Sequence, residues 1–283
     1  MLIWEADFYR RPLRNQAGDS LWELVICDAG GSFQYSAYCP QSEVRVDWLV
    51  EEMQALLAAG HSRPDRVHVF RPQSLSLLET ACQTLGILVE PTRHTPTLKR
   101  RLEELSRHYP GLPTYTGQSY KPLELDKPPP IPMPENLWGD RWRFATLPAS
   151  DVVDAFRDRM IPVLEMPEPL LPLNLGLAST VAVPGVVMDG GRRSLPLAHW
   201  IEQTRSVALN YVAGAPDGLI LEAGLVDRWV VATFEDLDVA EAARAYEQRK
   251  QLSQGLHFLL VQPDDSGMTY TGFWLLRSAN DEW

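Results

Sequence analysis

The sequence is poor in cysteine. Among its 283 residues the three cysteines are Cys27, Cys39 and Cys82, and no two of them form a CxxC pair. An odd number at these spacings argues against a disulfide framework and against a zinc site built from cysteines. Cys27 and Cys82 lie in apolar patterns typical of buried thiols. We therefore expect a reducing compartment.

Long apolar runs and a secretion signal are also missing. No apolar run approaches the roughly 20 residues that span a bilayer, so no membrane insertion is expected. The opening stretch, MLIWEADFYRRPL, has no basic start followed by an apolar segment, and it is too acidic for an organelle transit peptide. We expect the chain to work where it is made.

Motifs that carry chemistry are scarce. The sequence contains no GxSxG, HExxH, P-loop or GxGxxG pattern, and its six histidines show no metal-ligand spacing. His68 and His257 lie in apolar runs of strand length and are expected to be hydrogen-bonded core residues. These patterns predict no cofactor and no metal site.

Positive charge is in deficit. The formal net charge is −11, and a surface of this sign repels a polyanion at long range. Any binding of nucleic acid must therefore come from a local basic or aromatic patch.

Residues 1–109 predict one mixed α/β domain. Alternation predicts strands over residues 1–8, 21–28, 33–38, 67–70 and 87–89, and helical periodicity predicts helices over residues 47–59, 74–85 and 96–108. Arg10, Arg11 and Pro12 are expected to begin a loop, and Ser74 and Thr95 to cap helices. The order β-β-β-α-β-α-β-α is that of a ribonuclease-H-like domain.

Proline marks the domain boundary. Residues 110–136 hold eight of the 23 prolines, so residues 110–137 predict a semi-rigid linker. Residues 138–283 predict a second mixed α/β domain, and the fold class is therefore mixed α+β with two domains. Its predicted helices cover residues 151–160, 195–213 and 239–253, and its predicted strands cover residues 142–145, 184–188, 218–223, 228–234, 256–262 and 271–276. Residues 161–184 predict an ordered loop.

A ribonuclease-H-like order raises the alternative of a metal-dependent nuclease. Such a site needs several carboxylates that converge on two Mg²⁺ ions. The candidate acids are Asp7, Asp28 and Glu51 or Glu52. Arg71 and Pro72 follow the fourth predicted strand, where a further carboxylate would be needed. The set is incomplete, so Asp7 and Asp28 are interpreted as strand-end or turn acids, and no catalytic residue is predicted.

Basic and aromatic residues interleave in the second half of the chain. Single-stranded nucleic acid is held by bases stacked on aromatic side chains and by cations along its backbone. Gly190 and Gly191 precede Arg192 and Arg193. Two interpretations of this stretch are open: backbone N–H groups that surround a phosphate, or a solvated turn. The candidate RNA-binding residues are Trp138, Arg141, Trp142, Arg143, Arg192, Arg193, Arg249, Lys250 and Trp274.

Several stretches, in order along the chain, carry a resemblance: MLIWEADFYRRPL, LWELVICD, PGVVMDGGRRSLPLAHW, GLILEAGLVDRWVVATF, YEQRKQLSQGLHFLLVQ and TGFWLL. They resemble the TAB-two-type RNA-binding family, translation factors for a message that encodes a photosystem I reaction-centre protein. The resemblance implies a non-catalytic protein that binds a single-stranded, A/U-rich 5′ leader of an mRNA. It also implies the chloroplast stroma or the cytoplasm of a photosynthetic bacterium, and the expected lack of a transit peptide favours the cytoplasm.

Two other functions stay open. One is a protein-interaction scaffold in translation or photosystem assembly, whose protein partners would hold the RNA. The other is the nuclease. The family's closing WLL motif corresponds to Trp274, Leu275 and Leu276, which either contact RNA or complete a sheet.

Overall fold

The chain folds into two compact units in the computed structural model, which describes residues 1–278. The boundary falls between Asp126 and Lys127. The proline-rich segment is therefore divided, with residues 110–126 in the first unit and residues 127–137 in the second. The domain limits expected at residues 109 and 138 stay predictions.

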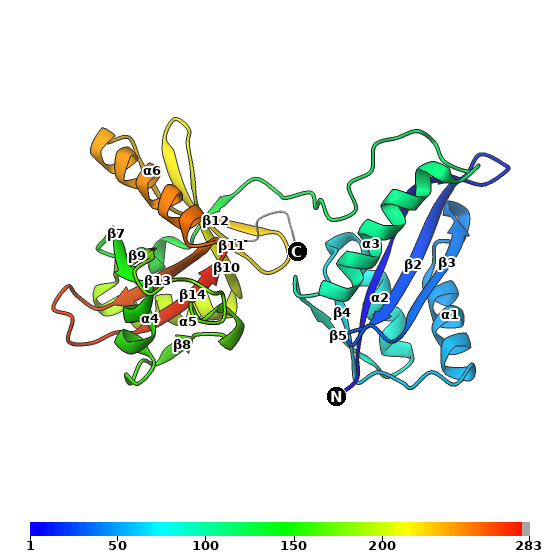
Figure 1. The fold of residues 1–283 in the computed structure, drawn as a ribbon, viewed down its shortest axis with the longest axis horizontal. Coiled ribbons are helices and arrows are strands. Elements are labelled where there is room, and N and C mark those ends of the chain that lie inside the picture. The colour runs from blue at the N-terminus through cyan, green and yellow to red at the C-terminus, as the bar shows by residue number, and fades with distance from the viewer. Residues whose placement is uncertain (279–283) are drawn as a thin grey trace. The chain divides into compact units, whose positions relative to one another are not determined.

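The first unit has one five-stranded sheet. Its strands are β1 (Ile3–Arg14), β2 (Ser20–Asp28), β3 (Gln34–Pro40), β4 (Arg66–Val69) and β5 (Leu88–Pro91), and its helices are α1 (Val46–Ala58), α2 (Pro72–Thr84) and α3 (Pro96–His108). The order across the sheet is β3-β2-β1-β4-β5, with β1 to β3 antiparallel and β4 and β5 parallel to β1 (Figure 1). The predicted element order is confirmed, and the topology is ribonuclease-H-like.

Helices cover both faces of this sheet. Successive strand residues point to opposite faces, so β2 places Leu24 and Ile26 in the core shared with α1 and α2. It places Val25 and Cys27 in the core shared with α3. The three-layer arrangement follows from a strand that is apolar on both sides.

β1 is longer than predicted. It runs on to Arg14 through an irregularity in its pairing with β2 after Arg10. Arg11 and Pro12 are therefore strand residues and not the start of a loop. Both are buried, which places the Arg11 guanidinium inside the unit.

The helix caps also differ from those predicted. Ser74 lies inside α2, where its hydroxyl donates to the carbonyl of Phe8 at 2.8 Å. Thr95 precedes α3, but its side chain makes no capping bond. Instead the Glu5 carboxylate on β1 accepts from the Leu98 N–H at 2.7 Å. Burial raises the pKa of Glu5, and the bonds from the α3 backbone only partly offset this. A residue distant in sequence therefore caps the helix.

The second unit has two sheets. Its strands are β6 (Ile131–Pro132), β7 (Arg141–Pro148), β8 (Val163–Glu165), β9 (Ala182–Asp189), β10 (Ser206–Val212), β11 (Asp217–Ala223), β12 (Asp227–Phe234), β13 (Leu256–Gln262) and β14 (Gly272–Arg277), and its helices are α4 (Ala149–Phe156), α5 (Ser194–Gln203) and α6 (Leu237–Leu252). The sheet orders are β7-β9-β13-β14-β8 and β10-β11-β12-β6 (Figure 1).

β13 is the central strand of the larger sheet, and every one of its residues is buried. Phe258 and Leu260 pack with α4 on one face, and Leu259 and Val261 pack with α5 and α6 on the other. Gly185 on β9 leaves room for the Phe258 ring, which a Cβ atom would overlap. The predicted closing pair of strands is confirmed as the antiparallel pair β13 and β14.

Two predictions in this unit are wrong. Residues 195–213 form α5 and then β10, because Arg205 turns the chain with a φ of 55° and the following residues pair with β11. Residues 161–184 contain β8 and the start of β9. β9 pairs with β13 in parallel and with β7 on its other side, despite Pro184. Within residues 1–278, no helix is both long and apolar enough to cross a membrane.

Candidate functional site

Several predicted RNA-binding residues meet around Asp189, at the carboxyl end of β9. Arg141 Nε donates to Asp189 Oδ2 at 2.6 Å, and Arg143 Nη1 donates to the same oxygen at 3.0 Å. The register explains this, because antiparallel pairing of β7 with β9 sets Arg141 opposite Asp189. We call this group the Asp189 cluster; it comprises Trp138, Arg141, Arg143, Asp189, Arg192 and Arg193.

The Asp189 carboxylate is the buried anchor of the cluster. It is 2 % exposed, and Gln262 at the end of β13 donates to its Oδ1 at 2.8 Å. Burial alone would raise the pKa of Asp189, but the hydrogen bonds from Gln262, Arg141 and Arg143 outweigh burial and lower it. The carboxylate therefore stays ionised at neutral pH and fixes two guanidiniums that remain accessible to solvent.

Gly190 and Gly191 join β9 to the arginine pair. Their N–H groups donate to the carbonyls of Gln262 and Pro263 at 2.8 and 2.9 Å, and the Arg193 N–H donates to the Gly190 carbonyl at 2.9 Å. These donors are already used within the protein and are not free to surround a phosphate, so of the two open interpretations of this loop the turn is the one that fits. The loop instead presents the exposed side chains of Arg192 and Arg193.

Trp138 supplies the aromatic surface of the cluster. Its side chain is 51 % exposed, and the indole Nε1 donates to the Met133 carbonyl at 3.2 Å. Its own carbonyl accepts from Arg193 Nη1 at 3.0 Å. The exposed indole is thus fixed at its edge, and the exposed Arg193 guanidinium is fixed at the backbone carbonyl of the same residue. An exposed ring and a cation anchored at one residue suit a stacked base and its phosphate.

Trp142 lies between Arg141 and Arg143 in sequence but on the other face of β7, as strand alternation requires. Its ring packs against Phe144 and Phe234, with centroids 5.4 Å away in each case. The structure therefore separates this tryptophan from the arginines beside it.

The two basic residues at the end of α6 lie outside the cluster. Arg249 Nη1 contacts Thr146 Oγ1 at 3.5 Å. Thr146 is further along β7 than Arg141, roughly 17 Å away at about 3.3 Å per residue. Lys250 is 4 % exposed, and its Nζ donates to Asn210 Oδ1 at 2.7 Å and Glu247 Oε1 at 2.6 Å. Its bonds are satisfied inside the unit, so Lys250 leaves the candidate surface.

Trp274 is a core residue with 0 % exposure, and Leu275 and Leu276 are also buried. The WLL motif lies in β14, between β13 and β8. No ring face of Trp274 is open to a base, so this residue also leaves the candidate surface. Of its two open interpretations, the motif completes the sheet.

The Asp7 region bears on the nuclease alternative. Asp7 is fully buried, and its carboxylate accepts from Arg71 Nε at 2.8 Å and from Arg11 Nη2 at 3.0 Å. Arg11 Nε also donates to buried Glu23 at 2.9 Å. Asp7 is thus the centre of an ion-pair network and not a strand-end acid. Across residues 1–278, no three His, Cys, Asp or Glu side chains lie close enough to hold a metal.

Asp28 does lie in a turn, as predicted. Its carboxylate accepts from the Ser32 hydroxyl at 3.0 Å and from the Phe33 N–H. This acid stabilises the turn from β2 to β3.

Sequence reasoning missed Asp189, Gln262 and Asp265, the last of which pairs with Arg141. A signal was present: Asp189 and Gln262 each end an apolar run of strand length. The carboxyl ends of neighbouring parallel strands meet at one edge, where polar side chains converge. The sequence did not reveal that the two strands, β9 and β13, are parallel neighbours.

Comparisons with known proteins identify the family. The model of "RNA-binding protein Tab2/Atab2 N terminal" matches residues 3–105, and that of "RNA-binding protein Tab2/Atab2, C-terminal domain" matches residues 120–277. The chain is 35 % identical over 283 residues to a chloroplastic Protein TAB2 homolog of Zea mays, covering 96 % of this chain and 70 % of the relative. It is 32 % identical over 280 residues to the corresponding Arabidopsis thaliana protein, covering 96 % and 74 %.

Solved structures add little. The HTLV-2 integrase catalytic core domain in complex with magnesium aligns with 40 % of this chain and 76 % of that chain, at 14 % identity and a TM-score of 0.26. This score is too low to support a conclusion. On the two family models and the two plant relatives, the chain belongs to the RNA-binding protein Tab2/Atab2 family.

Proposed function

We propose that this chain binds the single-stranded, A/U-rich 5′ leader of a photosystem I reaction-centre message and promotes its translation without catalysing a reaction. Family membership supports RNA as the partner. The single observation that carries the proposed surface is the exposed Trp138 indole on a residue whose backbone carbonyl accepts from the exposed Arg193 guanidinium. The leader and the message come from the resemblance of the sequence.

The Asp189 cluster suits a single strand for a physical reason. Bases stack on an aromatic ring while cations follow the phosphates, and Trp138 with Arg192 and Arg193 supplies both groups. Arg141 and Arg143 are already held by Asp189, so little side-chain freedom is lost when they meet a phosphate. A fixed local patch can bind a polyanion although the net charge is −11.

The proposed compartment is the cytoplasm of a photosynthetic bacterium, or the stroma if the chain works in a chloroplast. The plant relatives are both named as chloroplastic. Components of translation or of photosystem assembly are the proposed protein partners.

A direct test measures binding of the full chain to a fluorescent single-stranded A/U-rich leader at several salt concentrations. We expect Arg192→Glu with Arg193→Glu to abolish binding. We expect Arg192→Ala with Arg193→Ala to reduce the slope of log K against log salt by about 1.4, since each phosphate contact contributes about 0.7. The matched control is Arg14→Glu with Arg157→Glu, two exposed arginines outside the cluster. Unchanged affinity and slope in the cluster variants would refute this surface.

A second candidate is a protein-interaction scaffold whose partner holds the RNA, and the acidic net charge favours it. The purified chain would then have no affinity for the leader. A stable protein partner would copurify with it from nuclease-treated extract. The nuclease alternative predicts Mg²⁺-dependent cleavage of a labelled leader by the purified chain.

A further inference from the structure

β3 forms an open edge of the sheet in the first unit. It pairs with β2 over its whole length without a bulge, and within residues 1–278 no strand pairs with its other side (Figure 1). Native proteins protect such edges with short strands, charged side chains, prolines or bulges. β5 at the opposite edge follows this rule, because it has four residues and ends at Pro91. β3 has seven residues, no charged side chain and a proline only at its last position.

The backbone of β3 turns three residues outward. The Asp28 N–H donates to the Phe33 carbonyl at 3.2 Å, where the pairing of the two strands begins. Hydrogen-bonded pairs alternate along an antiparallel ladder, so every second residue from Phe33 bonds to β2. The residues between them, Gln34, Ser36 and Tyr38, therefore point their N–H and C=O groups away from the sheet. Their side chains are exposed as well.

Acidic residues flank this edge. Residues 34–54 contain one basic residue, Arg45, and four acidic ones, Glu43, Asp47, Glu51 and Glu52. Burial raises the pKa of the Cys39 thiol on β3 to about 11, and Glu43 and Glu52 add to this rise, so both carboxylates lie close enough to act on the strand. These charges repel the phosphates of RNA. They also disfavour a second copy of this chain, because pairing of β3 with β3 would bring the same acids together.

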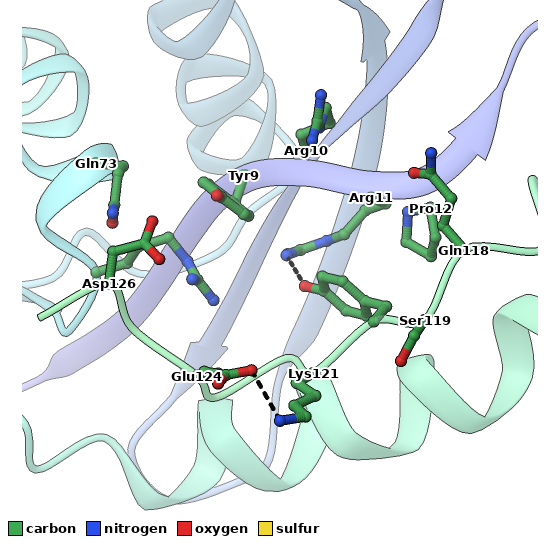
Figure 2. A pocket seen from close by; sticks show the side chains of 12 residues that line it. Tyr9, Arg10, Arg11, Pro12, Gln73, Gln118, Ser119, Lys121, Glu124 and Asp126 are labelled. Carbon is green, nitrogen blue, oxygen red and sulfur yellow. Dashed lines mark hydrogen bonds and ion pairs between the residues drawn. The ribbon is translucent and has the colours of Figure 1, made fainter.

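The cavity of about 210 Å³ beside β1 is another place for a partner in this unit. Figure 2 shows that two of its charged side chains are already paired. Arg11 Nη1 donates to the Tyr120 hydroxyl at 2.6 Å, and Lys121 Nζ lies 3.2 Å from Glu124 Oε2. A ligand there would have to compete with these contacts. The outward N–H and C=O groups of β3 have no such partner within residues 1–278.

We propose that β3 binds an extended, lysine- or arginine-rich segment of a partner protein as an additional strand. In strand addition the paired main chains supply affinity, and the side chains of the added segment supply specificity. The acids beside β3 favour basic side chains in that segment. The inference rests on the proposed function only in that a protein partner proposed there supplies the segment, and it does not depend on the Asp189 cluster.

The test uses the full chain and two synthetic peptides of about seven residues, in which valine alternates with lysine or with glutamate. Fluorescence anisotropy should show that the lysine peptide binds, more weakly as salt rises, and that the glutamate peptide does not. Amide hydrogen exchange followed by NMR should slow about fivefold or more at Gln34, Ser36 and Tyr38 when the lysine peptide is bound. Binding without slower exchange at these amides would be a nonspecific charge contact and would overturn the inference.

Proline variants test the pairing itself. Ser36→Pro should weaken binding of the lysine peptide about tenfold, because it removes an outward N–H that the ladder with β2 does not use. It also removes the hydroxyl that donates to buried Glu23. Gln34→Pro removes an outward N–H and leaves that bond in place, so it keeps the test valid if Ser36→Pro is unstable. Unchanged peptide affinity in both variants overturns the inference.

Charge reversal tests the preference for a basic segment. Glu43→Lys with Glu51→Lys should weaken binding of the lysine peptide. The matched control is Glu79→Lys with Glu124→Lys, two exposed acids of the same unit on α2 and beside the cavity, and it should bind as the unchanged protein does. Equal weakening in both variants would mean that the peptide follows the overall charge, and the assignment to β3 would fail.

Other occupants give different results. A dimer that forms at high protein concentration, protects the same three amides and is lost in Ser36→Pro would assign the edge to a second copy and overturn the inference. Protection of these amides by a uridine strand would assign it to RNA, with the same consequence.

The inference and the proposed function can fail separately. Ser36→Pro should bind the RNA leader as the unchanged protein does, and Arg192→Ala with Arg193→Ala should bind the lysine peptide normally. If the peptide does not bind while RNA affinity still depends on the Asp189 cluster, only the β3 assignment fails. If the peptide binds as expected and the arginine variant binds RNA normally, only the Asp189 surface fails.

Discussion

Arg141 Nε lies 2.6 Å from Asp189 Oδ2, and this bond joins the ends of two neighbouring strands, β7 and β9. The bond raises the pKa of the Arg141 guanidinium and helps to lower that of the Asp189 carboxylate. A buried acid therefore holds exposed cations in one arrangement. The account of RNA binding depends on this arrangement.

Replacing Asp189 by asparagine should destabilise the second unit. The amide keeps the shape of the side chain but loses the charge that binds Arg141, Arg143 and Gln262. We expect the Tm of that unit to fall by about 4 °C or more, since charge-assisted hydrogen bonds are lost. Calorimetry measures this, with the exposed Asp154→Asn as control. Equal Tm values in the two variants would contradict the anchoring role.

Trp138→Ala should weaken binding of single-stranded RNA by about 1 to 3 kcal/mol, the contribution of stacking one base on an aromatic ring. Trp138→Phe should retain most of the affinity, because a smaller ring still offers a stacking face. Fluorescence anisotropy at constant salt measures both variants. If Trp138→Ala bound as tightly as the unchanged protein, the indole would not contact a base.

Stability should fall in mild acid because of His257. Its buried ring accepts from the Leu209 N–H at 2.8 Å and contacts the Gly255 carbonyl at 2.8 Å, so it is held neutral. Burial, with a contribution from Lys250, lowers the pKa of His257 to about 3, against an ordinary value of 6.5. This stability is complete above pH 6.5 and is lost progressively as pH falls toward 3, because only the unfolded state takes up the proton.

Between pH 7 and pH 5 this histidine should therefore contribute a loss of about 2 kcal/mol in the free energy of unfolding. Glutamine can donate and accept a hydrogen bond but does not titrate in this range. Between pH 7 and pH 5, the free energy of unfolding of His257→Gln should therefore fall by about 2 kcal/mol less than that of the unchanged protein. Denaturant unfolding at both pH values measures the difference. The exposed His199→Gln should behave like the unchanged protein. Identical pH dependence in all three proteins would show that His257 is not responsible.

Asp7→Ala should destabilise the first unit strongly. Removing this carboxylate leaves the buried guanidiniums of Arg11 and Arg71 without their shared anion. Removing one partner of a buried ion pair lowers the free energy of unfolding by about 3 to 5 kcal/mol, because the other charge stays buried without a partner. Thermal unfolding of the first unit measures this, with the exposed Asp19→Ala as control. A shift no larger than that of the control would mean that the network does not stabilise the fold.

The fold of the first unit followed from the sequence because its signals are local. Alternating strands and amphipathic helices ended by Gly60 and Gly86 gave the correct element order. Residues 195–213 were mispredicted because their apolar positions fit a helix as well as a strand. The turn at Arg205 depends on pairing with β11, which no local pattern reveals.

The site was predictable only in part. The sequence identified Trp138 and the arginine pairs, but it also suggested Trp274 and Lys250, which the folded unit buries. Strand alternation alone could have separated Trp142 from Arg141 and Arg143. The role of Asp189 required knowledge that β9 lies between β7 and β13.

Crosslinking tests the central claim most directly. The full chain is irradiated with a 4-thiouridine-labelled leader, and the crosslinked peptides are mapped by mass spectrometry. The account predicts crosslinks within residues 138–143 and 190–193, lost in Arg192→Glu with Arg193→Glu. Crosslinks confined to other surfaces, such as the exposed face of α3, or unchanged in that variant, would contradict it.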